Sequence, residues 1–202
     1  GVGLMFERSP LGLVYNCEFD QSEVGLVFRG SAVGTVWDSC FHDNEDGLLS
    51  SSRSSVYVRR SSFRDNTDVG LLAFVNSDLT VVSSEVTGNG SGGAGAQFRS
   101  SLDLLDVVFR EHDGVHVFAT EHGAVHFVSG VTLGGSQDRT AWSAGLGASS
   151  TLTAGWRSTF YGDVYLLGDS FLELGELSVN GRIWATSFSR VSLGRTLVSK
   201  EA

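Results

Sequence analysis

The densest group of side chains suited to chemistry lies in residues 110–127, which read REHDGVHVFATEHGAVHF. This stretch holds four of the five histidines of the chain and three carboxylates: His112, His116, His122, His126, Glu111, Asp113 and Glu121. Imidazole and carboxylate groups are common zinc ligands, and they are equally common general acids and bases. The stretch is therefore a candidate metal centre or catalytic site.

Spacing limits which of these groups can act together. His112 and His116 would lie about 13 Å apart in one strand, so they share a site only if a turn folds the chain between them. The candidate catalytic residues are Glu111, His112, Asp113 and His116. The candidate zinc ligands are His116, Glu121 and His126. The alternative interpretation is that all of them are exposed polar residues on strand faces and corners.

Carboxylates form a second candidate site between residues 43 and 68. Aligned segments place Asp43 above Asp65, and Asp46 approximately above Asp68, on coils about 4.8 Å apart. Like charges this close raise each other's pKa or bind a cation, and calcium suits such oxygen ligands. The alternative is an edge neutralised by ion pairs without metal. The arginines that would supply those pairs are Arg59, Arg60 and Arg64.

Both candidate sites lie on a repeated unit. Three segments align almost column for column: NCEFDQSEVGLVFRGS, DSCFHDNEDGLLSSSRS and SSFRDNTDVGLLAFVNS. The aligned apolar positions recur at a nearly constant spacing, at Phe19, Phe41, Phe63, Val86 and Phe109. A short fixed period is typical of a solenoid, in which each unit packs on the next.

Polar residues recur with the same period and mark the turns of the unit. One column consists of Ser22, Asn44, Asn66 and Asn89. A second column carries hydroxyl groups at Ser9, Ser31, Ser54, Ser77, Ser100 or Ser101, and Thr120. Stacked Asn side chains hydrogen-bond between neighbouring turns, and Asn tolerates a left-handed backbone. Between these columns the apolar residues alternate with period two, which favours short strands over helices.

These columns resemble the right-handed parallel β-helix repeat of pectate lyases, polygalacturonases, phage tailspikes and bacterial surface proteins. The resemblance covers residues 2 to about 130. It implies an all-β, single-stranded right-handed parallel β-helix solenoid, with coils of about 22 residues and roughly nine coils in all. It also implies an exposed strand face on which such enzymes place their sites, and it allows a calcium site in the acidic cluster.

The repeat is regular only in the first part of the chain. We expect regular coils over residues 1–139, followed within the same domain by less regular β coils or a C-terminal cap over residues 140–202, where the Asn column is lost. An uncovered solenoid end exposes apolar side chains and unpaired backbone groups. Because Gly1 begins directly in a repeat, we expect the N-terminal coil to be covered by sequence outside this chain or by a partner.

The enzyme motifs that the resemblance would imply are incomplete. Polygalacturonase-like sites combine NTD with a paired DD. Asn66, Thr67 and Asp68 supply NTD, but the same letters follow from the Asn column, and the chain contains no DD. Catalysis thus stays an alternative: a polysaccharide lyase or glycoside hydrolase that uses an exposed carboxylate or histidine site.

Aromatic residues offer a further functional interpretation. Tyr15 and Trp37 occupy one column, and a second group lies late in the chain, at Trp142, Trp156, Tyr161, Tyr165 and Trp184. An aromatic strip on an outward face would stack on sugar rings, whereas on an inward face it is ordinary core. We expect these residues to belong to the core.

Charge and composition limit the classes of partner that the chain can bind. The chain has 14 basic and 23 acidic residues, a net charge of -9, which disfavours nucleic acid. Its longest uncharged run, residues 140–156, is largely Gly, Ser, Thr and Ala, so no membrane span is expected. We predict an extracellular or cell-surface β-helix that binds a polysaccharide or another protein, or serves as structure, within a larger protein. Besides the candidate zinc ligands, the sequence predicts calcium as a candidate cofactor and indicates no other.

Overall fold

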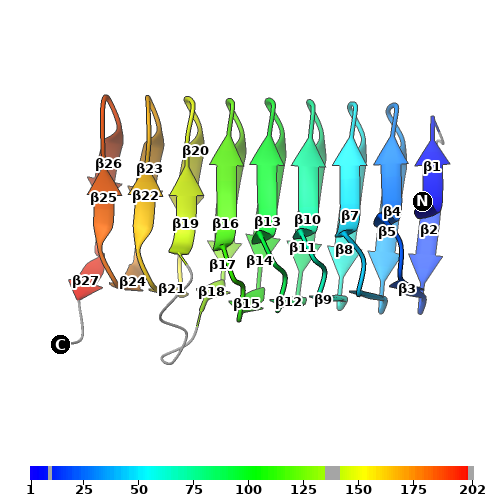
Figure 1. Ribbon diagram of the computed structural model, residues 1–202. Coiled ribbons are helices and arrows are strands. Elements are labelled where there is room, and N and C mark those ends of the chain that lie inside the picture. Colours follow the sequence, from blue (N-terminus) through cyan, green and yellow to red (C-terminus); the bar gives the residue numbers. More distant parts are fainter. Residues whose placement is uncertain (9–10, 135–141, 200–202) are drawn as a thin grey trace.

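The computed structural model describes residues 1–8, 11–134 and 142–199, which form a stack of β coils (Figure 1). These residues contain 27 strands in three parallel sheets of nine strands each, and no helix. Each coil adds one strand to each sheet in turn, so strands that are neighbours in a sheet come from successive coils. The predicted all-β parallel β-helix is confirmed.

The three sheets are named A, B and C in the order in which the chain enters them. Sheet A contains β1 (Val2–Glu7), β4 (Val24–Arg29), β7 (Asp46–Ser51), β10 (Val69–Phe74), β13 (Gly92–Gln97), β16 (Val115–Thr120), β19 (Trp142–Leu146), β22 (Val164–Leu166) and β25 (Ile183–Ala185). Sheet B contains β2 (Gly12–Tyr15), β5 (Val33–Trp37), β8 (Ser55–Arg59), β11 (Asp78–Val82), β14 (Ser101–Leu105), β17 (Ala124–Ser129), β20 (Thr151–Ala154), β23 (Phe171–Leu174) and β26 (Arg190–Leu193). Sheet C contains β3 (Glu18–Asp20), β6 (Cys40–His42), β9 (Ser62–Arg64), β12 (Glu85–Thr87), β15 (Val108–Arg110), β18 (Thr132–Leu133), β21 (Ser158–Tyr161), β24 (Leu177–Asn180) and β27 (Leu197–Ser199).

Strand register gives the length of each coil. In the first coil Val2 pairs with Val24, and the coils that follow keep nearly the same length up to β16. The later pairs of sheet A show one longer coil followed by two shorter ones: Val115 with Trp142, Ala144 with Val164, and Val164 with Ile183. Strands after residue 141 still pair in parallel with those before it. The expected boundary at residues 139 and 140 lies outside the described residues.

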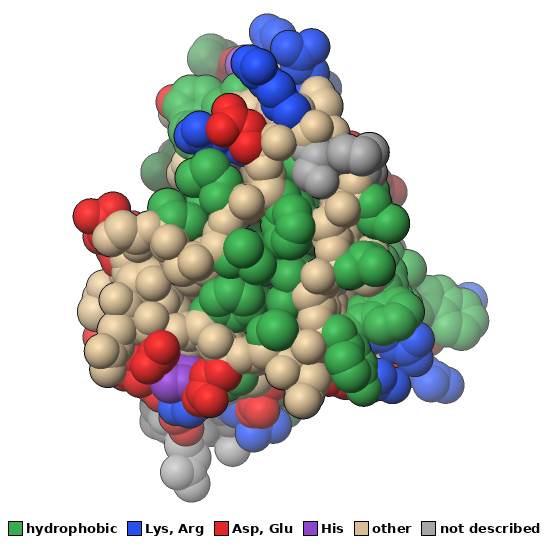
Figure 2. All heavy atoms as spheres, turned by 90° about the vertical axis from the view of Figure 1, so that its right-hand side faces the viewer, with side chains coloured by type: hydrophobic (Ala, Val, Ile, Leu, Met, Phe, Trp, Pro, Cys, Tyr) green, Lys and Arg blue, Asp and Glu red, His purple; other side chains and the backbone are tan. Residues whose placement is uncertain are grey.

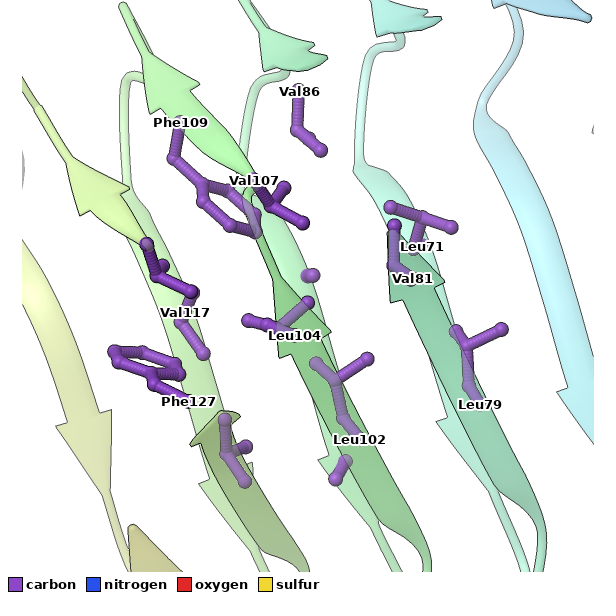
Figure 3. Packing of buried hydrophobic residues seen from close by; sticks show 14 of the residues in the cluster. Leu71, Leu79, Val81, Val86, Leu102, Leu104, Val107, Phe109, Val117 and Phe127 are labelled. Atoms are coloured by element: carbon purple, nitrogen blue, oxygen red, sulfur yellow. The ribbon is translucent and has the colours of Figure 1, made fainter. Parts of the chain in front are cut away.

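The core is built from side chains that stack directly from coil to coil. Phe19, Phe41 and Phe63 lie parallel in sheet C, with ring centroids 4.8 and 4.7 Å apart. In the middle coils this column continues through Val86 and Phe109, which face aliphatic residues of the other sheets (Figure 3). Each buried Phe contributes roughly 1.5–3 kcal/mol of transfer free energy, so the column is a large part of the stability.

Two polar ladders bind the coils at their corners. Between sheets C and A, Asn44 Oδ1 accepts the backbone N–H of Ser22, and Asn66 Oδ1 accepts that of Asn44. Between sheets B and C, the serine Oγ atoms accept backbone N–H groups of the preceding coil in the same way, at Ser39, Ser61 and Ser84. Buried backbone donors therefore keep a partner at every turn of these coils.

The predicted hydroxyl column between sheets A and B is correct only in its middle. Buried Ser54, Ser77 and Ser100 lie there, and Ser77 donates its N–H to Ser100 Oγ. Ser31 is instead an exposed corner residue with a φ of 67°, and Thr120 is the last residue of β16. Ser9 lies outside the described residues. The sequence alignment misplaced Ser31 and Thr120 because hydroxyl residues are frequent on both sides of this corner.

The coil cross-section is triangular, with apolar side chains in its centre (Figure 2). In the first coil, Val2, Leu4 and Leu13 are exposed. That a partner or further sequence covers this coil stays a prediction. Within residues 1–8, 11–134 and 142–199, no helix has the length and apolarity to cross a membrane.

Candidate functional site

The histidines proposed as catalytic lie inside the β-helix. His112 and His116 are buried, and the turn between them folds their rings to a centroid distance of 5.1 Å. His112 Nδ1 lies 3.0 Å from the backbone nitrogen of Asn89 and accepts its hydrogen bond. His112 is thus the next member of the Asn ladder, and its position one repeat after Asn89 is the signal that sequence reasoning missed.

The other residues of this cluster face different surroundings. Glu111, Asp113 and Glu121 are exposed at corners. His126 lies on the outer face of sheet B, where its Nδ1 is 2.7 Å from Thr153 Oγ1. The structure brings His112 and His116 together but sets Glu121 and His126 apart from them. Among the described residues, no three His, Cys, Asp or Glu side chains are placed to hold one metal ion.

Asp43 and Asp65, one stacked pair of the acidic cluster, form ion pairs at the edge of sheet C. Asp43 Oδ2 lies 2.6 Å from His42 Nδ1, and Asp65 Oδ2 lies 3.1 Å from Arg64 Nη1. His42 Nε2 lies 2.7 Å from Glu18 Oε1. Hydrogen bonds that the His42 ring donates to the carboxylates of Asp43 first and Glu18 second raise the pKa of His42. Asp43 and Asp65, the stacked pair, therefore each have a basic neighbour.

Asp46 differs from these carboxylates, because it is half-buried. Desolvation raises its pKa to about 6, with further contributions from the charges of Asp68 and Glu45. The backbone N–H of Val69 donates to Asp46 Oδ1 and opposes the shift. The like-charge effect expected from stacking is present, but burial is the larger cause. Asp43, Asp46, Asp65 and Asp68 stay candidate calcium ligands by prediction alone.

The expectation that Tyr15 and Trp37 belong to the core is wrong. Their side chains are 65% and 43% exposed on the outer face of sheet B. Period-two alternation points Val14 and Val36 inward, so their neighbours Tyr15 and Trp37 point outward. The other inward positions of β2 and β5 are Gly12 and Gly34, where the rings of Phe6 and Phe28 fill the space: a Cβ on Gly34 would lie 2.4 Å from the ring of Phe28.

The late aromatic group is also largely outward. Trp142, Tyr165 and Trp184 lie on the outer face of sheet A, with centroid distances of 4.3 Å and 6.2 Å between successive rings. Trp156 is 68% exposed at the corner between sheets B and C. Tyr161 ends β21 on the outer face of sheet C, so the late aromatic residues belong to three separate surfaces.

A groove of about 770 Å³ runs along the corner between sheets B and C, over the coils from β5 to β15. We call it the first groove. Five serines line it. Ser39, Ser61 and Ser84 are the buried ladder residues, whose hydroxyls are hydrogen-bonded to the backbone, so the hydroxyls left for a ligand are those of Ser62 and Ser83. Its charged side chains are Asp38, Arg60, Glu85, Asp106 and Arg110. Hydroxyl, carboxylate and guanidinium groups in one groove can hydrogen-bond a polar ligand both as donors and as acceptors.

The backbone makes the rim of this groove regular. Asp38, Arg60, Ser83 and Asp106 occupy the same corner position in four successive coils, all with a φ between 49° and 53°. The guanidinium of Arg60 donates two hydrogen bonds of 2.7 Å to the carboxylate of Asp38. These bonds lower the pKa of Asp38, so the pair stays charged. Trp37 immediately precedes Asp38 and presents its exposed ring on the sheet B side.

Sequence reasoning did not identify the first groove. Its rim residues recur once per coil, but they differ in type from coil to coil, so they do not form a visible column. Only the strand register shows that one corner holds them all.

Comparison with known proteins agrees with this architecture. Neither curated proteins nor solved structures give a match. Residues 1–129 match the family model described as a right handed beta helix region, which is more than half of the chain. With its parallel coils and its matching repeat, the chain belongs to this right-handed β-helix family.

Proposed function

We propose that this chain is a polysaccharide-binding module of a larger secreted or cell-surface protein, and that its binding site is the first groove. The observation that carries the proposal is the combination of the groove with the outward aromatic residues Tyr15 and Trp37. Sugar rings present apolar faces and polar edges. An exposed aromatic ring suits the faces, and a groove lined by carboxylate and guanidinium groups with the hydroxyls of Ser62 and Ser83 suits the edges.

The placement of the ionisable residues supports binding over catalysis. A general acid or base must reach the bond that reacts, and the buried imidazoles of His112 and His116 are out of reach of a polymer on the surface. The groove does contain the carboxylates of Glu85 and Asp106. Two carboxylates flanking a bond are the minimum for glycoside hydrolysis, so the enzyme alternative rests on this pair.

Titration calorimetry against soluble polysaccharides, neutral and acidic, tests the proposal. We expect Trp37→Ala to weaken binding about tenfold, the loss of roughly 1.4 kcal/mol of aromatic contact. Trp142→Ala, an exposed tryptophan on sheet A, is the matched control and should leave binding unchanged. If no polysaccharide binds, or if only the control variant loses binding, the proposal is wrong.

The enzyme alternative has its own readout. Release of reducing ends or of unsaturated sugars from the bound polysaccharide would mark hydrolysis or elimination. If such products form, and Glu85→Gln or Asp106→Asn abolishes them while binding persists, the module is an enzyme.

A further inference from the structure

A second groove of about 800 Å³ lies farther along the same corner between sheets B and C. We call it the second groove. Its lining includes Trp156 and Arg157 after β20, Glu176 after β23, and Arg195 after β26. Like the first groove it combines hydroxyl groups and charges of both signs, and its exposed aromatic ring, Trp156, is part of its lining, whereas Trp37 lies beside the first groove, next to Asp38. Two similar surfaces thus share one edge of the β-helix.

The backbone of this edge is continuous between the two grooves. The corner position that Asp106 holds in one coil is held by Gly130 in the next and by Arg157 in the coil after that, with φ values of 53°, 67° and 60°. Asp106 donates its N–H to Ser129 O, and Gly130 donates its N–H to Trp156 O. The same left-handed corner therefore passes from the first groove into the second.

Gly130 leaves the corner position between the two grooves without a side chain. It has no side chain, and a Cβ at this position would lie 2.1 Å from Asp106 Oδ1. The carboxylate of Asp106 therefore extends over the glycine, toward the second groove. A larger residue here would displace this carboxylate and would also be strained by the positive φ. At its corner position, the one coil between the grooves thus places no side chain and receives the carboxylate of Asp106.

Charge distinguishes this edge from the rest of the chain. The two grooves together are lined by four carboxylates, those of Asp38, Glu85, Asp106 and Glu176, and by four guanidinium groups, those of Arg60, Arg110, Arg157 and Arg195. The chain as a whole carries a net charge of -9. A balanced edge on an acidic protein has little net attraction for an anionic or a cationic polymer, so it suits an uncharged one.

We infer that the two grooves form one continuous track that binds a single linear, uncharged polysaccharide, with Trp37 near one end and Trp156 near the other. This inference rests on the proposed function and specifies its ligand. Trp37 ends β5 and Trp156 follows β20, five coils on, which is about 24 Å at the usual strand spacing. A chain that contacts both rings gains from the second contact without an added cost of association.

A length series of neutral oligosaccharides tests the inference. The probes are cello-, xylo-, manno- and malto-oligosaccharides from disaccharide to decasaccharide, with affinity measured by titration calorimetry. In the series that binds, affinity should rise about tenfold, the value of the second aromatic contact, once the chain spans the distance between the two tryptophans. Trp37→Ala and Trp156→Ala should each bring the long oligosaccharide close to the affinity of the short one, and Trp142→Ala should leave it unchanged. Thermal unfolding confirms that each variant is folded.

The outcomes separate this inference from the proposed function. If Trp37→Ala weakens binding while Trp156→Ala has no effect, or if affinity does not depend on chain length, the track is wrong and the first groove alone is the site. Stronger binding of uronic-acid oligosaccharides than of neutral ones would overturn the ligand class. If no oligosaccharide or polysaccharide binds, the proposed function fails and the track fails with it.

Discussion

The coils up to residue 129 and those after residue 141 keep the same three sheets but differ in what joins them. In the earlier coils, stacked Phe rings, the Asn ladder and the Ser ladder recur at a nearly constant spacing. In the later coils, the sheet A register shortens, and sheet C has only one Asn in the described coils, Asn180. Parallel strand pairing over a core of small and aliphatic residues with a single inward ring among the described residues, Phe160, is thus sufficient for the coil, and the ladders add stability to it.

The largest expected effect comes from breaking the aromatic stack of the earlier coils. Phe41 lies between two parallel rings and is fully buried, so Phe41→Ala should lower the free energy of unfolding by about 4 kcal/mol. Phe160, equally buried but with a single edge contact to Phe127, is the matched residue of the later coils. Urea unfolding measures both. A larger loss for Phe160→Ala would contradict the contrast between the two regions.

The next effect concerns the Asn ladder. Asn66 Oδ1 accepts from Asn44, and its Nδ2 donates to Phe41 O and to Asn89 Oδ1. Asn66→Ala leaves buried groups without partners, so a loss of roughly 2–3 kcal/mol is expected. Asn180→Ala in the later coils removes one hydrogen bond, from Ser199, and should cost about 1 kcal/mol or less. If both variants lose the same free energy of unfolding, the ladder contributes no more to stability than a single hydrogen bond does.

Much of the fold, but little of the site, followed from the sequence. Phe19, Phe41 and Phe63 revealed the coil because identical residues at a constant period are visible without coordinates. The expectation that Tyr15 and Trp37 belong to the core fails because the sequence does not show which of the two alternating faces of β2 and β5 points inward. The first groove is not visible in the sequence, because only the strand register brings its lining residues to one corner.

His112 gives a prediction of intermediate size, because it extends the Asn ladder with a different side chain. His112→Asn offers an acceptor for the N–H of Asn89 in the same place, and we expect its free energy of unfolding to stay close to that of the parent. His112→Ala removes the acceptor and should lose about 1–2 kcal/mol. Thermal unfolding at pH 8 compares the two. If the Asn variant is as unstable as the Ala variant, His112 is not a ladder residue.

The smallest expected change in the free energy of unfolding comes from Asp46. This residue lies in the regular coils, and we expect its buried charge to destabilise them. Its pKa is raised to about 6, chiefly by burial. A carboxyl with a raised folded pKa binds its proton more tightly in the folded state, so its ionisation costs stability above that pKa and costs nothing at pH values where both states are protonated. Asp46→Asn keeps an oxygen to accept the N–H of Val69.

Asp46→Asn should therefore raise the free energy of unfolding at pH 8 by roughly 1 kcal/mol, after allowance for the exposed part of the side chain. The gain should shrink as pH falls through about 6 and disappear below pH 4. Asp43→Asn, whose carboxylate is exposed and paired with His42, is the control and should bring no gain at pH 8. A stabilisation of Asp46→Asn that is constant from pH 8 to pH 4 would mean that something other than the buried charge is responsible, because only a titrating group makes the difference between the two chains depend on pH.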